Sequence, residues 1–567
     1  MLSSIKRAYL NRDVSLGTTP AQMSYMAGLS AILGAVGGVA AYLVVHTVGL
    51  ISNLALLHRV GFNLPDLRYY HASPALIPIA VAGGVVVALL SLWSPVIKGH
   101  GIPESIQAIM FNESRIRPRA AVAKPLSAAV AMGTGGPFGA EGPIIVMGGS
   151  VGSLIGQLLP VSPAQRRILL ACGAAAGMTG VFGTPLAAII MAFELLVFER
   201  SLRSLVPLMV STAIADTLHS VLLQSRPLFA VEHPLHVPGG DLWLFVVLGV
   251  AVGGLAVVLN KVLAAFEMGY DRLALPSFWH PVIGAVGFAL VGLVVPGTLS
   301  VGYWAITDAV NGRFLLGEAA ALCLGKALSW WIALGSNTSG GTLAPMFLIG
   351  ATMGEMMGVG FANLFPGAHL APAAFALAAM GATFGVGARA PLTGVVFAAE
   401  VTGDYAMIVP LLVVTAVADL LAEVMLQERI MTDRLARRGL RVEFDAVVDI
   451  PCTQVADKPG WESTDQARPA RAKEDLVQPP TLDPLGQLRS TRSYKEIVSF
   501  LREHSAMRRR EARIGVEGLD GPALPQGDKK DDCADTDRHE SQRSVLSEDE
   551  SGTGTGQSDA GLGGEEI

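Results

Sequence analysis

Charged residues are scarce in this chain. They make up 16% of its 567 residues, whereas 51% are hydrophobic; soluble domains carry about 25% charged residues. The shortage is concentrated in residues 24–430, where apolar runs long enough to span a bilayer recur. These runs are continuous rather than alternating, which excludes an outer-membrane barrel. The composition therefore predicts an all-α polytopic membrane protein, with residues 24–433 as its transmembrane domain.

Cysteine is equally sparse. The four cysteines, Cys172, Cys323, Cys452 and Cys533, show neither metal-ligand spacing nor a paired pattern. No His/Glu metal motif and no serine–base pair stands at membrane depth either. We therefore expect no metal, no cofactor and no nucleic-acid partner, and transport rather than catalysis; a membrane-embedded enzyme is a remote alternative. The short, polar, slightly basic residues 1–23 predict an N-terminal cytoplasmic segment rather than a cleaved signal peptide.

The membrane region repeats itself. Residues 206–218 (VPLMVSTAIADTL) and 409–421 (VPLLVVTAVADLL) are identical at nine of thirteen positions. Other prolines and glycines pair at similar offsets, so the region consists of two related halves, about 24–225 and 240–430. Duplicated halves with interrupted helices are typical of transporters, whose binding site lies at the interface of the repeats.

One carboxylate stands in a glycine- and proline-rich turn. Glu141 belongs to the stretch Gly133–Gly156 (GTGGPFGAEGPIIVMGGSVGSLIG) and directly precedes a long apolar run. Gly139, Gly142 and Pro143 interrupt the chain where a helix begins, and the free N–H groups of a helix start attract anions. A charge at membrane depth is costly unless it serves an ion or proton pathway. The stretch predicts an anion site beside a tethered carboxylate; the alternative is a helix start stabilised by an acidic residue.

Three further breaks interrupt the apolar runs: Lys98–Glu104 (KGHGIPE), Ser339–Pro345 (SGGTLAP) and Gly387–Gly394 (GARAPLTG). Each has a structural alternative: a loop, tight helix packing through small residues, and, for the nearby Glu400 and its repeat mate Glu194, pairing within the protein. Taken together, glycine-opened helix starts at one interface would surround an anion with N–H groups and no full positive charge. Such a site binds an anion well enough to admit it and weakly enough to release it.

On these residues the chain resembles the CLC family of chloride channels and chloride/proton exchangers. Gly99–Glu104 is similar to the family's GSGIPE segment, and Gly133–Pro143 is similar to GSGxxxGxEGP, with Lys124 upstream as in the family. Gly341–Pro345 is similar to GxFxP, and Arg389–Gly394 resembles a further family block. The resemblance covers roughly residues 24–441, with the motifs in the family's order.

The resemblance implies two inverted-repeat halves of tilted, broken helices, and a homodimer in membrane lipid with a separate pore in each subunit. It also implies that Glu141 is the gate on the path of chloride. The positions that match the family's anion pathway are Gly99, His100, Gly101, Ile102, Pro103, Gly139, Ala140, Gly142, Pro143, Gly341, Thr342, Leu343 and Met431.

Four positions depart from the family pattern. His100 replaces the usual serine anion ligand, Met431 the pore tyrosine, and Leu343 the phenylalanine of GxFxP. His100 is either a neutral donor to the anion, a group that titrates near pH 6.5, or a water-facing loop histidine; Met431 is an apolar wall. Leu195, which follows Glu194, replaces the second glutamate that serves many exchangers as internal proton acceptor. An apolar residue there is typical of the family's channels.

The composition changes after residue 430. A basic cluster, Arg434, Arg437, Arg438 and Arg441, follows the last span and predicts a cytoplasmic C-terminus. Residues 434–520 are expected to form a cytoplasmic region with at most a degenerate CBS remnant near Val447–Val455. Residues 521–567 are rich in Gly, Ser and acidic residues and predict a disordered tail.

The sequence favours a passive, voltage- or pH-gated chloride channel with Glu141 as its gate, because Leu195 is apolar. A chloride/proton antiporter, or a CLC protein selective for another small anion such as fluoride, is the alternative. We expect a multi-pass protein of the plasma membrane with both termini in the cytoplasm.

Overall fold

The computed structural model describes residues 20–197, 201–223, 227–368 and 370–437, all within the first compact unit of the chain, Met1–Phe500. These residues are helical and contain one isolated β-bridge and no strand. Residues 1–19, the expected CBS remnant and the acidic tail at 521–567 lie outside the described residues.

The first half of the chain supplies the following helices in order: α2 (Pro20–Leu57), α3 (Leu76–Trp93), η1 (Pro95–Ile97), α4 (Ile102–Phe111), α5 (Pro118–Gly133), α6 (Glu141–Leu158), α7 (Pro163–Phe182), α8 (Pro185–Ala192), the π-helical turn η2 (Phe193–Val197) and α9 (Leu202–Leu222). The second half supplies η3 (Gly239–Asp241), α10 (Leu242–Asp271), α11 (His280–Val294), η4 (Pro296–Thr298), α12 (Tyr303–Val310), α13 (Leu316–Gly335), α14 (Leu343–Leu364), η5 (Pro366–Ala368), α15 (Pro372–Ala388), α16 (Pro391–Thr402), η6 (Tyr405–Met407), α17 (Ile408–Met425) and α18 (Ile430–Arg437).

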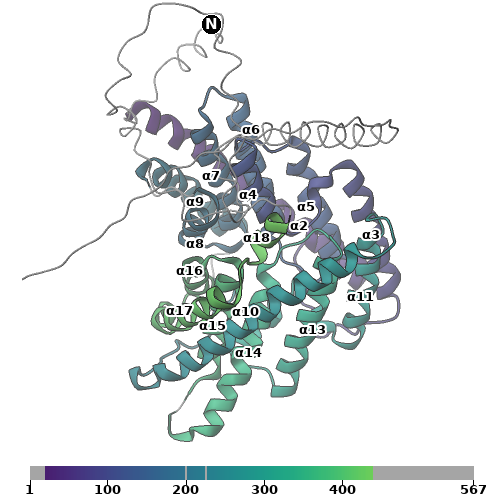
Figure 1. The fold of residues 1–567 in the computed structure, drawn as a ribbon, viewed down its shortest axis with the longest axis vertical. Helices are drawn as coiled ribbons and strands as arrows, with labels where there is room; N and C mark the ends of the chain where they lie inside the picture. Colours follow the sequence, from purple (N-terminus) through teal and green to yellow (C-terminus); the bar gives the residue numbers. More distant parts are fainter. Residues whose placement is uncertain (1–19, 198–200, 224–226, 369, 438–567) are drawn as a thin grey trace, which may run out of the picture. The chain divides into compact units, whose positions relative to one another are not determined.

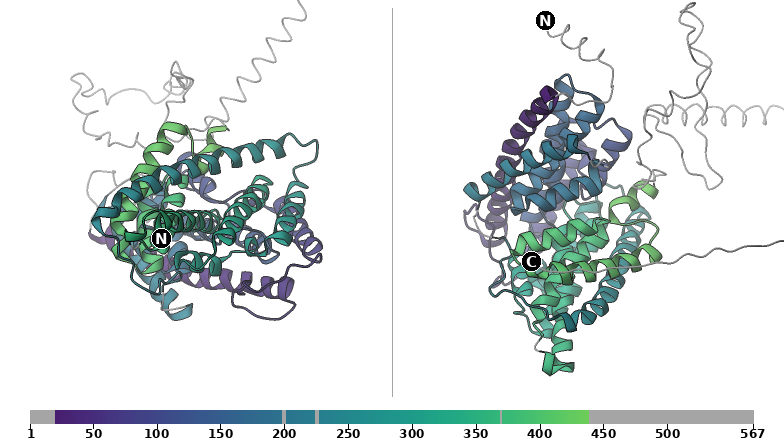
Figure 2. Two further views of the ribbon diagram at one scale, coloured as in Figure 1. Left: turned by 90° about the horizontal axis from the view of Figure 1, so that it is seen from below. Right: turned by 90° about the vertical axis from the view of Figure 1, so that its left-hand side faces the viewer.

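The two halves have the same order of elements. The helix α3, the turn η1 and the short helix α4 correspond to α11, η4 and α12, and α5–α9 correspond to α13–α17. Figure 1 shows α6, α7 and α9 of the first half gathered apart from α13, α14 and α17 of the second half. The right-hand view of Figure 2 shows the same division by colour. The structure thus confirms an all-helical fold built from two inverted-repeat halves.

Six helical segments are long and apolar enough to cross a membrane, and four shorter apolar helices accompany them among the described residues. Many outward-facing side chains of these helices are large and apolar, as lipid contact requires. Helices too short to cross a bilayer are tolerated in a membrane protein where they pack on other helices or line a cavity.

Small residues hold the central helices in place. In α6, a Cβ on Gly148 or Gly152 would overlap a backbone carbonyl oxygen of α7. Their repeat mates Gly350 and Gly354 in α14 approach the backbone of α15 in the same way. Close backbone approach through glycine is a common packing mode of membrane helices. It fixes α6 and α14 along their length and buries their N-terminal ends inside the protein.

Two glutamates form hydrogen bonds between the halves. Glu194 of the first half accepts hydrogen bonds from the backbone N–H groups of Leu392 (3.1 Å) and Thr393 (2.9 Å), at the start of α16. Its repeat mate Glu400 accepts from the N–H groups of Leu186 (3.0 Å) and Ala187 (2.7 Å), at the start of α8. Each carboxylate therefore satisfies the free amides of the other half's helix. The structural interpretation of these two glutamates is confirmed.

Replacing Glu400 with glutamine removes the negative charge from the start of α8. We expect Glu400→Gln to lower stability by about 1–3 kcal/mol, because hydrogen bonds to a charged group contribute about that much. Thermal unfolding in detergent, followed by tryptophan fluorescence, measures the change. The control is Asp271→Asn, at the exposed end of α10; equal melting temperatures for the two variants would contradict the capping role.

Candidate functional site

Two helix starts converge where the halves meet. Gly139, two residues before α6, and Gly341, two residues before α14, form an antiparallel β-bridge. Gly341 N donates to Gly139 O at 2.9 Å, and Gly139 N donates to Gly341 O at 3.3 Å. Since the first amides of a helix have no partner within the helix, the free N–H groups of α6 and α14 lie close together.

The side chain of Glu141, the first residue of α6, occupies this point of convergence. The residue is 1% exposed, and its Oε1 accepts a hydrogen bond from Leu343 N at 2.5 Å. The amides of Ala344 and of Glu141 itself also face the carboxylate, whereas Oε2 has no hydrogen-bond partner among the described residues. Amides and helix dipoles that suit an anion therefore surround the group that the sequence singled out.

The glycines beside Glu141 leave room for its carboxylate. A Cβ on Gly139 would overlap the carboxylate carbon and both oxygens, and a Cβ on Gly341 would overlap Oε1. Both positions must therefore lack a side chain while the carboxylate lies there. Ala140 and Thr342 immediately precede α6 and α14, and Pro143 lies in the first turn of α6.

The start of α4 is shaped by two glycines and a buried lysine. Gly99 and Gly101 have φ angles of 93° and 99°, a region that favours glycine. Lys124 is fully buried, and its Nζ donates to the carbonyl oxygens of Ile97 (2.7 Å) and Gly99 (2.6 Å). The lysine therefore holds the turn before α4 through its carbonyl groups. Its ammonium group is held by those carbonyls, and its charge acts on Glu104 and Arg434.

The start of α4 reaches the point where α6 and α14 meet. A Cβ on Gly142 would overlap His100 O and would lie 3.2 Å from Gly341 Cα, and a Cβ on Gly101 would lie 2.7 Å from Gly142 O. Ile102 and Pro103 form the first turn of α4. Three helix starts that are far apart in the sequence are thus brought together at Gly142, as the resemblance implied.

His100 is buried rather than exposed to water. It is 2% exposed, its Nδ1 has no hydrogen-bond partner among the described residues, and its ring hydrogen-bonds the backbone of Ile430. The interpretation as a water-facing loop histidine is therefore wrong, because α18 covers the segment before α4. Met431, the second residue of α18, is fully buried and apolar.

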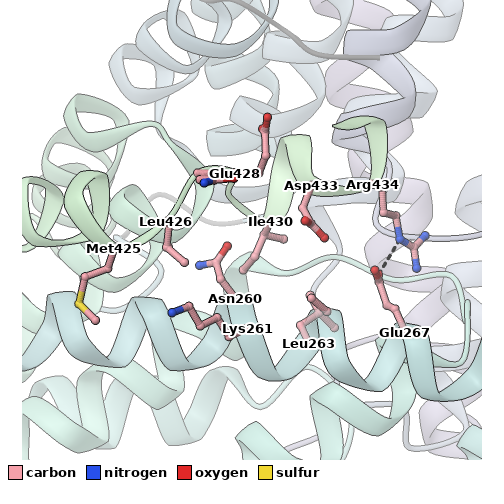
Figure 3. Close-up of a pocket in the computed structure, with 12 residues that line it drawn as sticks. Asn260, Lys261, Leu263, Glu267, Met425, Leu426, Glu428, Ile430, Asp433 and Arg434 are labelled. Atoms are coloured by element: carbon pink, nitrogen blue, oxygen red, sulfur yellow. Dashed lines mark hydrogen bonds and ion pairs between the residues drawn. The ribbon is translucent and has the colours of Figure 1, made fainter. Parts of the chain in front are cut away.

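Two arginines of α18 anchor this helix to α10. Arg434 Nε donates to Glu267 Oε1 at 2.6 Å, and Arg437 also pairs with Glu267. Figure 3 shows Glu267 and Arg434 at the edge of a cavity of about 370 Å³ between α10, α17 and α18. Arg434 and Arg437 of the basic cluster therefore both pair with Glu267 of α10.

Leu195 lies in the π-helical turn η2 and is 1% exposed. This turn contacts α4, and the residue after Glu194 is apolar, so position 195 supplies no proton acceptor. The adjacent Glu194 is engaged by α16, as described above.

Sequence reasoning missed two residues that lie near the site without forming a hydrogen bond to Glu141 among the described residues. Lys326 is fully buried, and its charge acts on Glu141; Tyr303 lies close enough for the charge of Glu141 to act on its hydroxyl. The internal repeat held the missing signal, because Lys326 follows Lys124 at an offset of 202, the offset that relates α6 to α14.

Comparisons with known proteins agree with this geometry. Residues 79–423 match the family model described as voltage gated chloride channel. The chain is 29% identical over 468 residues to the H(+)/Cl(-) exchange transporter ClcA of Vibrio campbellii, covering 80% of this chain and 98% of the relative. It is 28% identical over 445 residues to the protein of the same name from Salmonella typhi, covering 76% and 92%.

Solved structures give the same result for the fold. The chain is similar to a slow cyanobacterial Cl-/H+ antiporter, with a TM-score of 0.65 and 27% identity, covering 74% of this chain and 99% of that one. It is also similar in fold to a CLC-type fluoride/proton antiporter, with a TM-score of 0.60 and 19% identity, covering 72% and 98%.

A methyl group on Gly139 would compete with the Glu141 side chain for one volume. We expect Gly139→Ala to lower the melting temperature, because overpacking a filled site costs about 1–3 kcal/mol. Adding Glu141→Ala should remove most of that cost, since the three nearest atoms to the new Cβ all belong to Glu141. Melting temperatures of the two single variants and the double variant form the cycle; additive effects would show that the carboxylate lies elsewhere.

Proposed function

The chain belongs to the voltage-gated chloride channel (CLC) family of anion transport proteins, and from this premise we propose that it exchanges chloride for protons across a membrane, with Glu141 as the group that both ions use. The observation that carries the proposal is the place of the Glu141 carboxylate, buried among the free amides of α6 and α14. An anion and this carboxylate require the same N–H groups, so they exclude one another.

The exchange mechanism follows from the competition between chloride and the Glu141 carboxylate for the same N–H groups. When Glu141 is ionised, it satisfies the helix ends and closes the path. Protonation removes its charge, weakens its hold on the amides of Leu343 and Ala344, and frees them for chloride. A chloride that arrives from the other side displaces the carboxylate, which then takes up a proton. Each passage of chloride is thereby linked to the protonation state of one side chain.

The backbone supplies the anion selectivity. We propose that chloride is held by the N–H groups of Ala140–Gly142, of Thr342–Leu343 and of the turn Gly99–Ile102, with Met431 as an apolar wall. His100 replaces a serine and acts as a neutral donor in this turn, since its ring is buried and its Nδ1 is free of a protein partner among the described residues. Amide coordination without a full charge allows both binding and release.

Exchange is favoured over passive conduction by the relatives. The curated relatives similar to this chain are named H(+)/Cl(-) exchange transporters, and a structural relative is a Cl-/H+ antiporter. A passive chloride channel is the second candidate, and it is favoured by Leu195, which offers no proton acceptor on the inner side. Selectivity for another small anion such as fluoride is the third, since the serine and tyrosine side chains of the usual pathway are replaced.

We further propose a homodimer with one pore in each subunit, in the plasma membrane, with both termini in the cytoplasm. Apolar side chains on α8, α9, α16 and α17, such as Leu186, Met209 and Leu392, are half-exposed in the single chain. A second copy or lipid would cover them.

Reconstitution in liposomes under a chloride gradient tests exchange against conduction. We expect chloride efflux to drive protons inward against their gradient, recorded with a chloride electrode and a pH electrode in the same vessel. Chloride flux without proton movement would establish the channel. Fluoride flux in the absence of chloride flux would overturn the choice of anion.

Neutralising Glu141 should uncouple the two ions. We expect Glu141→Gln to retain chloride flux, to abolish chloride-driven proton movement, and to lose the pH dependence of the flux, because no other group carries a proton at the shared amides. The control is Glu400→Gln, a half-buried carboxylate on amides outside the pathway, which should keep both fluxes coupled. Survival of pH-dependent flux in Glu141→Gln would refute the gate.

A further inference from the structure

We propose that the start of α12 forms a further anion-binding site, outside the Glu141 gate, in which Lys326 supplies the charge and Tyr303 and Trp304 supply hydrogen-bond donors. The site would hold chloride, or another small inorganic anion of the same charge, before or after it passes the gate. The inference rests on the proposed function for its role, but the binding site itself can be tested without any flux.

The start of α12 repeats the start of α4. The turn before α4 places Gly99 and Gly101 at positive φ, and the turn before α12 places Ser300 (56°) and Gly302 (75°) at positive φ with the same spacing. Both turns follow a short 3-10 helix, η1 or η4, and both precede a short α-helix. The turn before α12 therefore has the same backbone conformation as the turn before α4.

The buried lysine is repeated as well. Lys326 Nζ donates to the carbonyl oxygens of Thr298 (3.0 Å) and Ser300 (2.9 Å), as Lys124 does to Ile97 and Gly99. A Cβ on Gly302 would lie 3.5 Å from this Nζ, so the ammonium group lies directly beside the turn that opens α12. Because the halves are inverted, this second cation and helix start lie on the opposite side of Glu141 from the first.

The start of α12 borders a cavity. Residues 64–67, in the loop between α2 and α3, and residues 300–304 enclose about 160 Å³. A water molecule occupies about 30 Å³ in the liquid, so the space admits a hydrated chloride. Gly302 lines the cavity, and a Cβ on it would lie 3.5 Å from the Lys326 ammonium group, so this group lies behind the cavity wall.

Two donors at this cavity lack partners. Tyr303 Oη and Trp304 Nε1 are buried and have no hydrogen-bond partner among the described residues. Buried donors are normally satisfied, so two unsatisfied donors in adjacent residues that line the cavity are available to an acceptor bound there. Glu141 Oε2, which is also unsatisfied, carries a charge that acts on Tyr303. Tyr303 therefore stands between the cavity and the gate.

The surrounding charges do not oppose an anion strongly. Asp308 is neutralised by Arg68 (2.8 Å) and Arg313 (3.0 Å), and hydrogen bonds to Glu232 and Asp308 raise the pKa of Arg313, so it stays charged. The Arg68 guanidinium lies 5.7 Å from the centre of the Trp304 ring. Asp66 is the remaining carboxylate at the cavity.

Asp66 is exposed, and its Oδ1 accepts from Arg68 N at 2.9 Å. Solvent screens its charge, whereas the charge of the buried Lys326 is screened much less. The balance at the cavity floor therefore favours an anion. Removing the Asp66 charge should strengthen the site.

Anomalous diffraction from crystals grown in bromide tests the site directly. We expect a bromide peak in the cavity beside Tyr303, in addition to a peak at the ends of α6 and α14 in the Glu141→Gln variant. Lys326→Met should remove the cavity peak and leave the other, Lys326→Arg should keep both, and Asp66→Asn should raise the occupancy of the cavity peak. If Lys326→Met does not fold, Tyr303→Phe should weaken the same peak.

Sided flux measurements give the second readout. With chloride varied on one side at a time, Lys326→Met should raise the half-saturating concentration on the Tyr303 side by roughly tenfold or more, since an anion loses its buried countercharge, and should leave the His100 side unchanged. Equal changes on both sides would indicate a purely structural lysine and overturn the proposal.

The two hypotheses fail in different ways. No bromide in the cavity, with bromide at the ends of α6 and α14, would overturn the additional site and leave the proposed function intact. Bromide in the cavity without any chloride flux from the protein would overturn the proposed function and leave the binding site standing.

Discussion

The structure depends on keeping one carboxylate among amides that lack any other partner. Glu141 is buried at the converging starts of α6 and α14, where water does not satisfy either the helix ends or the acid. Free amides without an anion would be costly, and so would a buried carboxylate without donors. The amides and the carboxylate satisfy each other's hydrogen bonds. The same complementarity allows the pair to separate, because an anion can replace the carboxylate at the amides and a proton can neutralise the carboxylate. Gating follows from this exchange of partners.

The duplicated architecture provides the geometry for that exchange. Helix starts can be buried at mid-membrane only if other parts of the protein cover them. Glycines such as Gly148 and Gly350 allow α6 and α14 to pack closely on their neighbours, while Glu194 and Glu400 cap helices of the opposite half. The two matched helices differ in their first residue, because α6 begins with Glu141 and α14 begins with Leu343. Two equivalent helix starts thereby share a single gate.

The sequence predicted much of this and missed what depends on three-dimensional neighbours. The apolar runs predicted a helical fold, and the internal repeat predicted its two halves. The glycine-rich segments predicted all three helix starts that meet at Gly142. Burial of His100 could not be read from a loop-like KGHGIPE segment, because α18, which covers it, comes more than 300 residues later. Lys326 was overlooked since a lysine in an apolar run carries no local motif. Only its offset from Lys124 identifies it.

Proton transfer on the inner side is the remaining physical constraint on the mechanism. Leu195 cannot accept a proton, and the neighbouring Glu194 is engaged by the amides of Leu392 and Thr393, so its use would uncap α16. His100 is the titratable group one peptide away from the convergence point, buried beside Lys124 and Arg434. Burial disfavours a charged imidazole, and the two nearby cations disfavour it further, so His100 remains the neutral donor of this turn. Coupling therefore rests on Glu141, whose carboxylate uses the same amides as the anion and takes up the proton itself.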